Sequence, residues 1–259
     1  MMPTTLIIKL TLLPVLIGLV SLAGRRWGPT VTGWLVALPL TSGPVVLFLA
    51  IEQGAAFAAR AARGTLLGII SLAAFCLVYS RLSRRADWFP CVLLSWAAFF
   101  VLTLALDNIT VPLLPAFLAV LVILAAVLRF LPDGIARAAP TNPPAWEIPM
   151  RMLAGTAVVV TLTGVAHSLG PRLSGLLTPF PVAATILGGF THHFEGAAAA
   201  VRLFRGLLAG LFAFAAFFLL IAVTIESWGL GASFGVASFA TLTLHGASLW
   251  FLNRTSHPT

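Results

Sequence analysis

The stretch Gly28-Pro-Thr-Val-Thr-Gly-Trp-Leu-Val-Ala-Leu-Pro39 has a second copy, Gly170-Pro-Arg-Leu-Ser-Gly-Leu-Leu-Thr-Pro-Phe-Pro181. Residues 28–80 align with residues 170–222 at a constant shift of 142 without a gap, and 19 of the 53 aligned positions are identical. Alanine and leucine would match by chance in so apolar a chain, but the repeated glycine, proline and arginine residues would not. We interpret the pattern as an internal duplication, which has to be recognised before the fold is argued.

The composition is that of an integral membrane protein. Of the 259 residues, 60% are hydrophobic and only 8% are charged, whereas a soluble domain carries roughly 25% charged residues. The apolar runs are long and do not alternate with polar residues, which predicts spanning helices rather than barrel strands. The net charge of +8 is dispersed between these runs, so it indicates orientation in a bilayer rather than binding to nucleic acid.

These runs predict an all-α polytopic membrane protein with about nine transmembrane helices, because most of them approach the ~20 residues that a spanning helix needs. We expect the first run to remain as a mature helix, although Ser21-Leu22-Ala23 resembles a signal-peptidase site. The predicted spans are residues 3–23, 30–52, 58–80, 88–106, 110–131, 149–168, 172–193, 199–224 and 229–252.

The distribution of lysine and arginine orients these spans. Eleven of the fifteen fall in the loops after the odd-numbered spans up to the seventh or at the C-terminus, and four fall on the other side. By the positive-inside rule, the N-terminus is outside and the C-terminus is cytoplasmic, in a bacterial inner membrane.

The duplication then predicts an inverted repeat. The second span matches the seventh, so the offset is five spans, and two copies separated by an odd number of spans cross the membrane in opposite directions. We predict a first four-helix repeat (residues 1–109), a connecting helix with a Pro-rich cytoplasmic linker (110–148) and a second, inverted four-helix repeat (149–259). Such repeats are a common build of secondary transporters.

Both copies of the quoted stretch predict a broken helix near the middle of the membrane. A proline removes a backbone donor and disturbs the preceding turn, and paired Gly/Pro-interrupted spans point to a transport site. A structural kink with close glycine packing is the alternative. The candidate substrate-binding residues are Gly33, Pro39, Thr41, Ser42, Gly175, Pro179 and Pro181.

A few ionisable residues lie in or beside the spans. Arginine pairs three residues apart begin the third and eighth spans, and an acidic residue precedes each pair, which predicts either interfacial ion pairs or gates at the two faces. His245 lies inside the ninth span, where an ionisable group is a candidate for proton coupling, or a neutral histidine bonded between helices. The candidate gate and charge-coupling residues are Glu52, Arg60, Arg63, Glu195, Arg202, Arg205 and His245.

The segment Thr191-His192-His193-Phe194-Glu195 could hold a metal ion, as in an intramembrane metalloenzyme, only if His192, His193 and Glu195 converge. We expect no metal site, because adjacent histidines point about 100° apart on a helix and the first copy has no histidine there. The chain contains no nucleotide-binding loop and no hydrolase motif. These absences argue against an enzyme, a primary pump and a cofactor.

The segment Ser174-Gly175-Leu176-Leu177-Thr178-Pro179-Phe180-Pro181, followed by Thr191-His192-His193, Glu195-Gly196 and Arg202, resembles the GlpM-like family of small membrane proteins of about four helices. The resemblance covers one four-helix unit at a time and implies two fused units. In plan the chain is also similar to the drug/metabolite transporter superfamily, but Lys9 and Arg151 stand where its small multidrug members have an acidic residue. That difference argues against a cation exporter.

The sequence therefore predicts a secondary active transporter, a permease or exporter, of a small polar or anionic solute. The solute would bind between the second and seventh spans, and access would alternate as one repeat rocks against the other. The alternative is a non-transporting scaffold or accessory subunit of a cell-envelope synthesis complex, which predicts a packed interior around Pro39 and Pro181.

Overall fold

The computed structural model describes residues 3–40, 42–107, 109, 111–134, 143–144, 146–158, 160–161 and 180–255. Across these residues the protein is helical and has no strand. A helical segment over residues 147–158 lies between α6 and α8 in the chain. The labelled helices are α1 (Pro3–Trp27), α2 (Pro29–Val36), α3 (Ser42–Gln53), α4 (Ala55–Leu82), α5 (Trp88–Asp107), α6 (Leu113–Phe130), α8 (Val182–Glu195) and α9 (Ala197–Thr255).

Four of the described helices are long and apolar enough to cross a membrane: α4, α5, α6 and α9. The outer faces of α5 and α6 carry large apolar side chains, such as Val101 and Val122, which are each 68% exposed. In water such faces would mark a docking surface or an aggregation hazard, but in lipid they are solvated. The described chain is thus a helical, membrane-embedded protein, and the length criterion identifies four spans rather than the predicted nine.

The predicted helix break at Pro39 is confirmed. α2 ends at Val36 and α3 begins at Ser42. The last turn of α2 tightens, because the Ala37 amide donates to the Trp34 carbonyl oxygen at 3.2 Å, and Pro39 then has no amide hydrogen to continue the helix. The Gly43 amide donates to the Pro39 carbonyl oxygen at 2.8 Å and starts α3.

Two glycines make matching junctions between helices. Gly54 joins α3 to α4 with a φ of 86°, and Gly196 joins α8 to α9 with a φ of 86°. These left-handed φ values favour glycine because it has no Cβ. The Gly54 amide donates to the Ala50 carbonyl at 3.1 Å, and the Gly196 amide donates to the equivalent His192 carbonyl at 3.0 Å.

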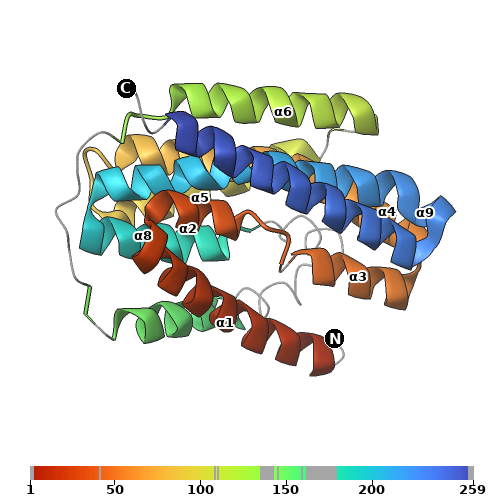
Figure 1. Cartoon of the computed structure of the whole chain (residues 1–259), viewed down its shortest axis with the longest axis horizontal. Coiled ribbons are helices and arrows are strands. Elements are labelled where there is room, and N and C mark those ends of the chain that lie inside the picture. Colours follow the sequence, from red (N-terminus) through yellow and green to blue (C-terminus); the bar gives the residue numbers. More distant parts are fainter. Residues whose placement is uncertain are drawn as a thin grey trace.

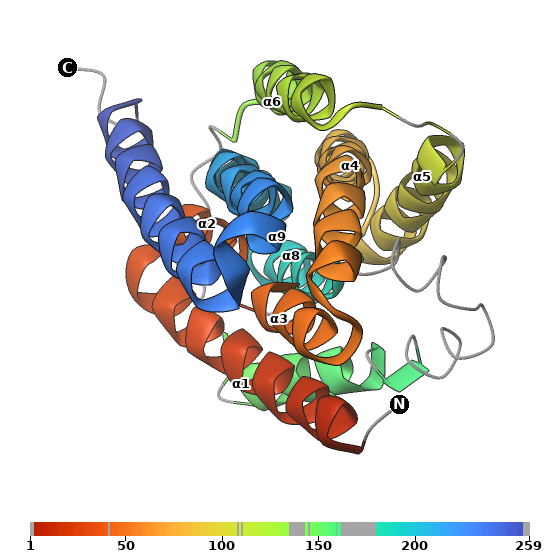
Figure 2. The same ribbon diagram turned by 90° about the vertical axis from the view of Figure 1, so that its right-hand side faces the viewer.

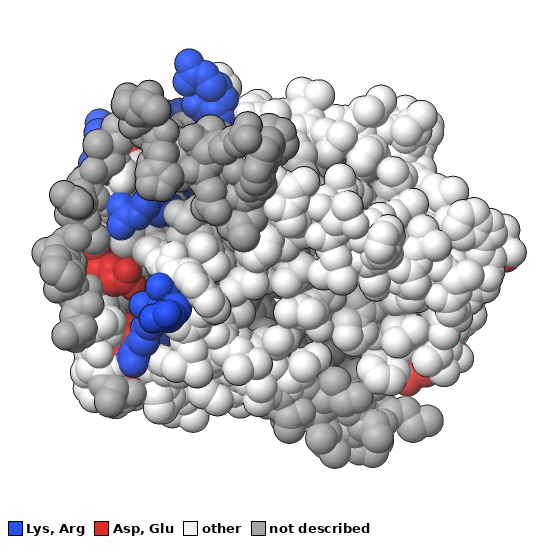
Figure 3. Space-filling view, in the orientation of Figure 1, with Lys and Arg blue, Asp and Glu red and all other residues white. Residues whose placement is uncertain are grey.

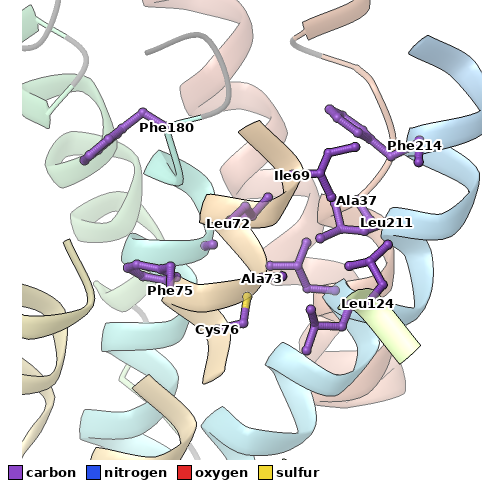
Figure 4. Close-up of a cluster of buried hydrophobic side chains, with 14 of the residues drawn as sticks. Ala37, Ile69, Leu72, Ala73, Phe75, Cys76, Leu124, Phe180, Leu211 and Phe214 are labelled. Carbon is purple, nitrogen blue, oxygen red and sulfur yellow. The ribbon is translucent and has the colours of Figure 1, made fainter. Parts of the chain in front are cut away.

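Gly229, with a φ of 73°, divides α9 into two arms that fold back on each other (Figure 1). The first arm of α9 and α4 lie at the centre of the molecule, and α5 and α6 lie outside them (Figures 1 and 2). On α4, the buried Ala73 lies on the side of Leu124 of α6 and Leu211 of α9, and Phe75 points to the opposite side (Figure 4). This core supports the short helix α2.

Glycines allow α2 and α9 to approach closely. A Cβ added at Gly33 would clash with the Leu203 carbonyl oxygen, and one added at Gly206 would clash with the Thr30 carbonyl oxygen. A similar approach joins α1 to the helical segment 147–158, because a Cβ at Gly18 would lie 3.1 Å from the Met152 sulfur. The first contact holds α2 against α9, and the second holds α1 against residues 147–158.

Candidate functional site

Basic side chains gather at one end of the molecule, on the left in Figure 3. Several of them hold the segment after α6, because Arg205 donates to the Pro132 carbonyl oxygen at 3.2 Å and Arg202 donates to the Gly134 carbonyl oxygen at 2.9 Å. We call this region the arginine-rich end. It contains Arg25, Arg81, Arg151, Arg202 and Arg205.

A polar pocket lies at the arginine-rich end, between α1, α2, residues 147–158 and α8. Its volume of ≈ 20 Å³ is enough for one water-sized group. The pocket is lined by Ser21, Gly24, Arg25, Pro29, Thr32, Pro143, Glu147, Arg151, Thr191 and Glu195.

Two arginines share one buried carboxylate in this pocket. Glu147 is 1% exposed and Arg151 is 4% exposed. Arg151 Nε donates to Glu147 Oε1 at 2.9 Å, and Arg151 Nη2 donates to the same oxygen. Arg25 Nη2 donates to Glu147 Oε2 at 3.1 Å from α1. The guanidinium of Arg151 also lies 5.6 Å from the centre of the Phe190 ring, over its face. Each oxygen of the Glu147 carboxylate therefore accepts a hydrogen bond from one of the two guanidinium groups.

Hydroxyl groups line the same pocket. Thr32 Oγ1 donates to the Gly28 carbonyl oxygen at 3.1 Å, and the Thr191 side chain is buried on α8. Ser21 is 4% exposed, and its Oγ has no hydrogen-bond partner among the described residues. An unpaired buried hydroxyl costs about 1–3 kcal/mol, so Ser21 is a donor that a bound group would satisfy.

Glu195 is the second acidic residue of the pocket and lies beyond the predicted span 172–193. Burial raises the pKa of its carboxyl group, and Glu147 raises it further, while Arg151 and Arg202 lower it. Burial is the largest of these effects. The neutral form of Glu195 is therefore favoured more than that of a carboxyl group in water.

A separate, apolar crevice lies along α1, α2 and α8, which also line the polar pocket. Its volume is ≈ 40 Å³. On α8, Ala183 and Leu187 line the crevice, and Thr191 and Glu195 follow in the pocket at the same four-residue spacing, which places all four on one helix face. The crevice is lined by Leu13, Leu16, Ile17, Val20, Leu35, Val36, Leu38, Leu40, Ala183 and Leu187.

The crevice brings the two predicted helix breaks together. Leu38 and Leu40, on either side of Pro39, share it with Ala183, two residues after Pro181. α8 begins at Val182, directly after Pro181. The lining at this depth is entirely apolar, so a polar solute has its polar partners nearer the arginine-rich end.

The other predicted substrate-binding residues have different surroundings. Gly33 packs against the α9 backbone, as the alternative of close glycine packing predicts, and Ser42 is buried at the start of α3. Thr41, Gly175 and Pro179 lie outside the described residues.

The predicted gate residues are arranged differently at the two ends. Glu52, Arg60 and Arg63 are exposed, and within the described part of the chain none of them forms an ion pair. The Arg60 guanidinium lies 5.8 Å from the centre of the Phe57 ring. At the arginine-rich end, Glu195 lies in the electrostatic field of Arg202.

Neither histidine before Glu195 lines the polar pocket. His192 Nδ1 lies 3.3 Å from the Tyr79 hydroxyl on α4. His193 contacts the Trp88 ring on α5 at a centroid distance of 6.4 Å. No group of three metal-ligating side chains occurs in the described ranges, so the convergence that the metalloenzyme hypothesis requires is absent there.

His245 is buried against the end of α2. It is 2% exposed, and its ring stacks on Trp34 with a centroid distance of 4.0 Å. Neither ring nitrogen has a hydrogen-bond partner among the described residues. The ring faces the backbone of Trp34 and Gly210, so proton coupling and a hydrogen bond between helices both stay predictions for this residue.

We expect His245→Leu to raise the melting temperature by about 2–4 °C, which corresponds to ~1 kcal/mol for a chain of this size. Removing the two unpaired ring nitrogens should raise the free energy of unfolding by about 1–3 kcal/mol. Losing the stacking on Trp34 should lower it by about 0.5–1.5 kcal/mol. Thermal unfolding in detergent measures the change. Thr243→Leu on the exposed face of the same arm, whose hydroxyl donates to Phe239, is the control. A lower melting temperature for His245→Leu would contradict the expectation.

Several residues of the polar pocket are not among the predicted site residues. The predicted linker (110–148) includes Glu147, but helical residues begin at position 147, which places Glu147 one turn before Arg151. The sequence does contain two signals: an acid–base pair spaced i, i+4 at residues 147 and 151, and the four-residue spacing of Thr191 and Glu195. The contributions of Ser21 and Arg25 from α1 have no such signal.

Comparison with known proteins adds no family or fold relative. No family model, no curated protein and no solved structure matches the chain. The functional argument therefore starts from the polar pocket and the apolar crevice.

Proposed function

We propose that this protein is a secondary active transporter of a small polar or anionic solute. The observation that carries the proposal is the continuous strip of residues on α1, α2 and α8 that runs from the polar pocket into the apolar crevice. The strip leads from the charged end of the molecule to the helix break at Pro39. Binding sites of secondary transporters lie at such breaks, between two repeats.

The proposed architecture is nine transmembrane helices in a 4+1+4 inverted repeat, which two fused GlpM-like units would also produce. Gly54 and Gly196 support it, because they are 142 residues apart and have the same φ and the same amide hydrogen bond. The α3–α4 and α8–α9 junctions lie at opposite ends of the molecule (Figure 1). Equivalent junctions at opposite ends are what an inverted repeat requires.

The proposed orientation places the arginine-rich end in the cytoplasm of a bacterial cell. The positive-inside rule supports this orientation, and so does the gathering of basic side chains at one end (Figure 3). The polar pocket then faces the cytoplasm, and the rocking of one repeat against the other exposes the solute to the outside.

A membrane scaffold is the second candidate, and one observation favours it. Gly33 and Gly206 bring α2 and α9 into backbone contact beside the break, and the lining at Pro39 is apolar. A scaffold needs such rigid packing and no solute flux. The transport experiment separates the two candidates.

We expect purified protein in proteoliposomes to move a small anion across the membrane when a pH gradient is applied. Arg25→Gln should slow uptake about tenfold or more, because a hydrogen bond to a charged group contributes about 1.5–3 kcal/mol. Arg25 is suited to the test because its side chain is 36% exposed and Glu147 keeps Arg151 as a partner when Arg25 is replaced. Uptake of labelled solute across a panel of carboxylates, phosphate and chloride measures the effect.

Arg84→Gln is the matched control, since Arg84 is an exposed arginine in the connection between α4 and α5. Its uptake rate should stay within about twofold of the wild-type rate, as for a surface charge. If no solute of the panel crosses the membrane, the transporter proposal is wrong and the membrane scaffold becomes the favoured function. Equal slowing by both substitutions would show that the polar pocket is not on the pathway.

A further inference from the structure

We propose that the polar pocket is a proton-linked binding site for a small carboxylate, and that Glu195 takes up the proton that accompanies the bound anion. The inference rests on the proposed transport function and names its solute class and its coupling ion. It is argued from the charges of the pocket, from the unpaired hydroxyl group and from the adjoining apolar crevice.

Among the residues that line the pocket, the charges favour an anion most when Glu195 is neutral. Arg25 and Arg151 contribute two positive charges, and Glu147 contributes one negative charge that both guanidinium groups share. These three residues leave one positive charge. An ionised Glu195 would cancel it, whereas a protonated Glu195 leaves it available to a monovalent anion.

The hydrogen-bond donors of the pocket point to an oxyanion. Ser21 Oγ is buried and unpaired among the described residues, and it lines the pocket together with the partly exposed Arg25. Guanidinium groups bind carboxylates through charge-assisted hydrogen bonds, which are about twice as strong as neutral ones. Ser21 and Arg25 thus supply one hydroxyl donor and one charged donor to the same bound group.

The size and continuation of the pocket point to an anion with an apolar chain. The ≈ 20 Å³ of the polar pocket is room for one water-sized group, such as one oxygen of a carboxylate. The apolar crevice starts one helical turn away, at Leu187 on α8 and at Val36 on α2. A short-chain carboxylate places its head beside Arg25 and its chain in the crevice. Phosphate and chloride have no apolar part to fill the crevice.

The proton moves in a direction that follows from the charges. An anion beside Glu195 disfavours the ionised carboxyl group, so binding transfers one proton from water to a Glu195 oxygen. The affinity is fully present below the pKa of Glu195 and falls as the pH rises through it. Burial has already raised this pKa, which moves the change toward physiological pH.

The other ionisable groups around Glu195 can be separated from it. Arg25, Arg151 and Arg202 carry guanidinium groups, and Glu147 forms ion pairs with those of Arg25 and Arg151. His192 precedes Glu195 by three residues, but its ring nitrogen contacts the Tyr79 hydroxyl on α4, and His193 contacts Trp88 on α5. A substitution of Glu195 alone therefore isolates its contribution.

The test is calorimetric titration of the purified protein with butyrate between about pH 5 and about pH 8, a range that covers a raised carboxyl pKa. For the wild type we expect the dissociation constant to rise up to about tenfold per pH unit, the limit for one linked proton. Titrations in two buffers of different ionisation enthalpy should give an uptake of up to one proton per butyrate. Glu195→Gln should bind butyrate with a constant affinity and without proton uptake.

Two further variants complete the test. Ser21→Ala should weaken butyrate binding about fivefold to tenfold, as expected for one lost hydrogen bond, with its pH dependence unchanged. Glu226→Gln, an exposed acid at the other end of α9's first arm, should behave as the wild type. A pH-dependent Glu195→Gln, or a wild type that binds butyrate without taking up a proton, overturns the inference, and the buffer comparison decides even if Glu195→Gln fails to fold.

Failure of the inference and failure of the proposed function give different results. If a solute crosses the membrane of the proteoliposomes but butyrate binding takes up no proton, the proton-linked carboxylate site is wrong and the transport function stands. If butyrate binding takes up a proton but no solute crosses the membrane, the transport function is wrong and the proton-linked binding site stands.

Discussion

Gly206→Ala is expected to destabilise the protein by about 3 kcal/mol, at the upper end of the usual cost of overpacking a core. A Cβ at Gly206 would overlap the Thr30 carbonyl oxygen and lie 3.1 Å from the Trp34 amide nitrogen. Both are backbone atoms of α2, which cannot rotate away as a side chain would. Thermal unfolding in detergent should show a melting temperature lower by about 6–12 °C.

Gly64→Ala is the matched control, because Gly64 is the residue 142 positions before Gly206. A Cβ at Gly64 would meet no heavy atom within 4 Å. Alanine in a helix interior is about 0.5–1 kcal/mol more favourable than glycine, so this variant should be as stable as the wild type or more stable. Equal shifts for the two variants would contradict the close contact of α2 with α9.

The helical class and the break at Pro39 could be predicted from the sequence because local chemistry determines them. Long apolar runs determine the helices. Pro39 determines the break because it lacks an amide hydrogen, and the glycines at positions 54 and 196 determine the junctions because they adopt positive φ. Because the sequence repeats after 142 residues, the junction glycine of the first copy has a counterpart in the second. Four described helices are long enough to span a membrane, and the other predicted spans stay a prediction.

The candidate site is less visible in the sequence because its parts come from separate helices. Hydropathy and charge indicate that His245 and Glu195 are unusual, and both are partly or fully buried. The same reasoning selects Glu52, Arg60 and Arg63, which are exposed. The polar pocket forms only because Gly18 and Gly155 bring α1 next to residues 147–158, and a contact between distant segments has no local signal.

The buried charge cluster leads to the second large effect. Glu147→Gln should cost about 3–5 kcal/mol, the range for removing one partner of a buried ion pair. The substitution keeps the shape of the side chain but leaves Arg151, which is 4% exposed, without a counter-charge at Glu147 Oε1. Thermal unfolding should therefore show a melting temperature lower by about 6–20 °C. Glu226→Gln at an exposed position should change it by no more than about 1–2 °C, as for an exposed charge.

A double substitution separates the loss of attraction from the cost of a stranded charge. Glu147→Leu combined with Arg151→Met removes both buried charges, and apolar replacements of a buried pair are often neutral or stabilising by about 1–4 kcal/mol. We expect the double variant to melt well above Glu147→Gln, while losing any solute binding that depends on Arg151. If it melts no higher than Glu147→Gln, the carboxylate stabilises the fold by more than neutralising Arg151. Arg25 donates to the same carboxylate from α1. The lost stability would then be that of the contact between α1 and residues 147–158, which the Arg25–Glu147 hydrogen bond forms.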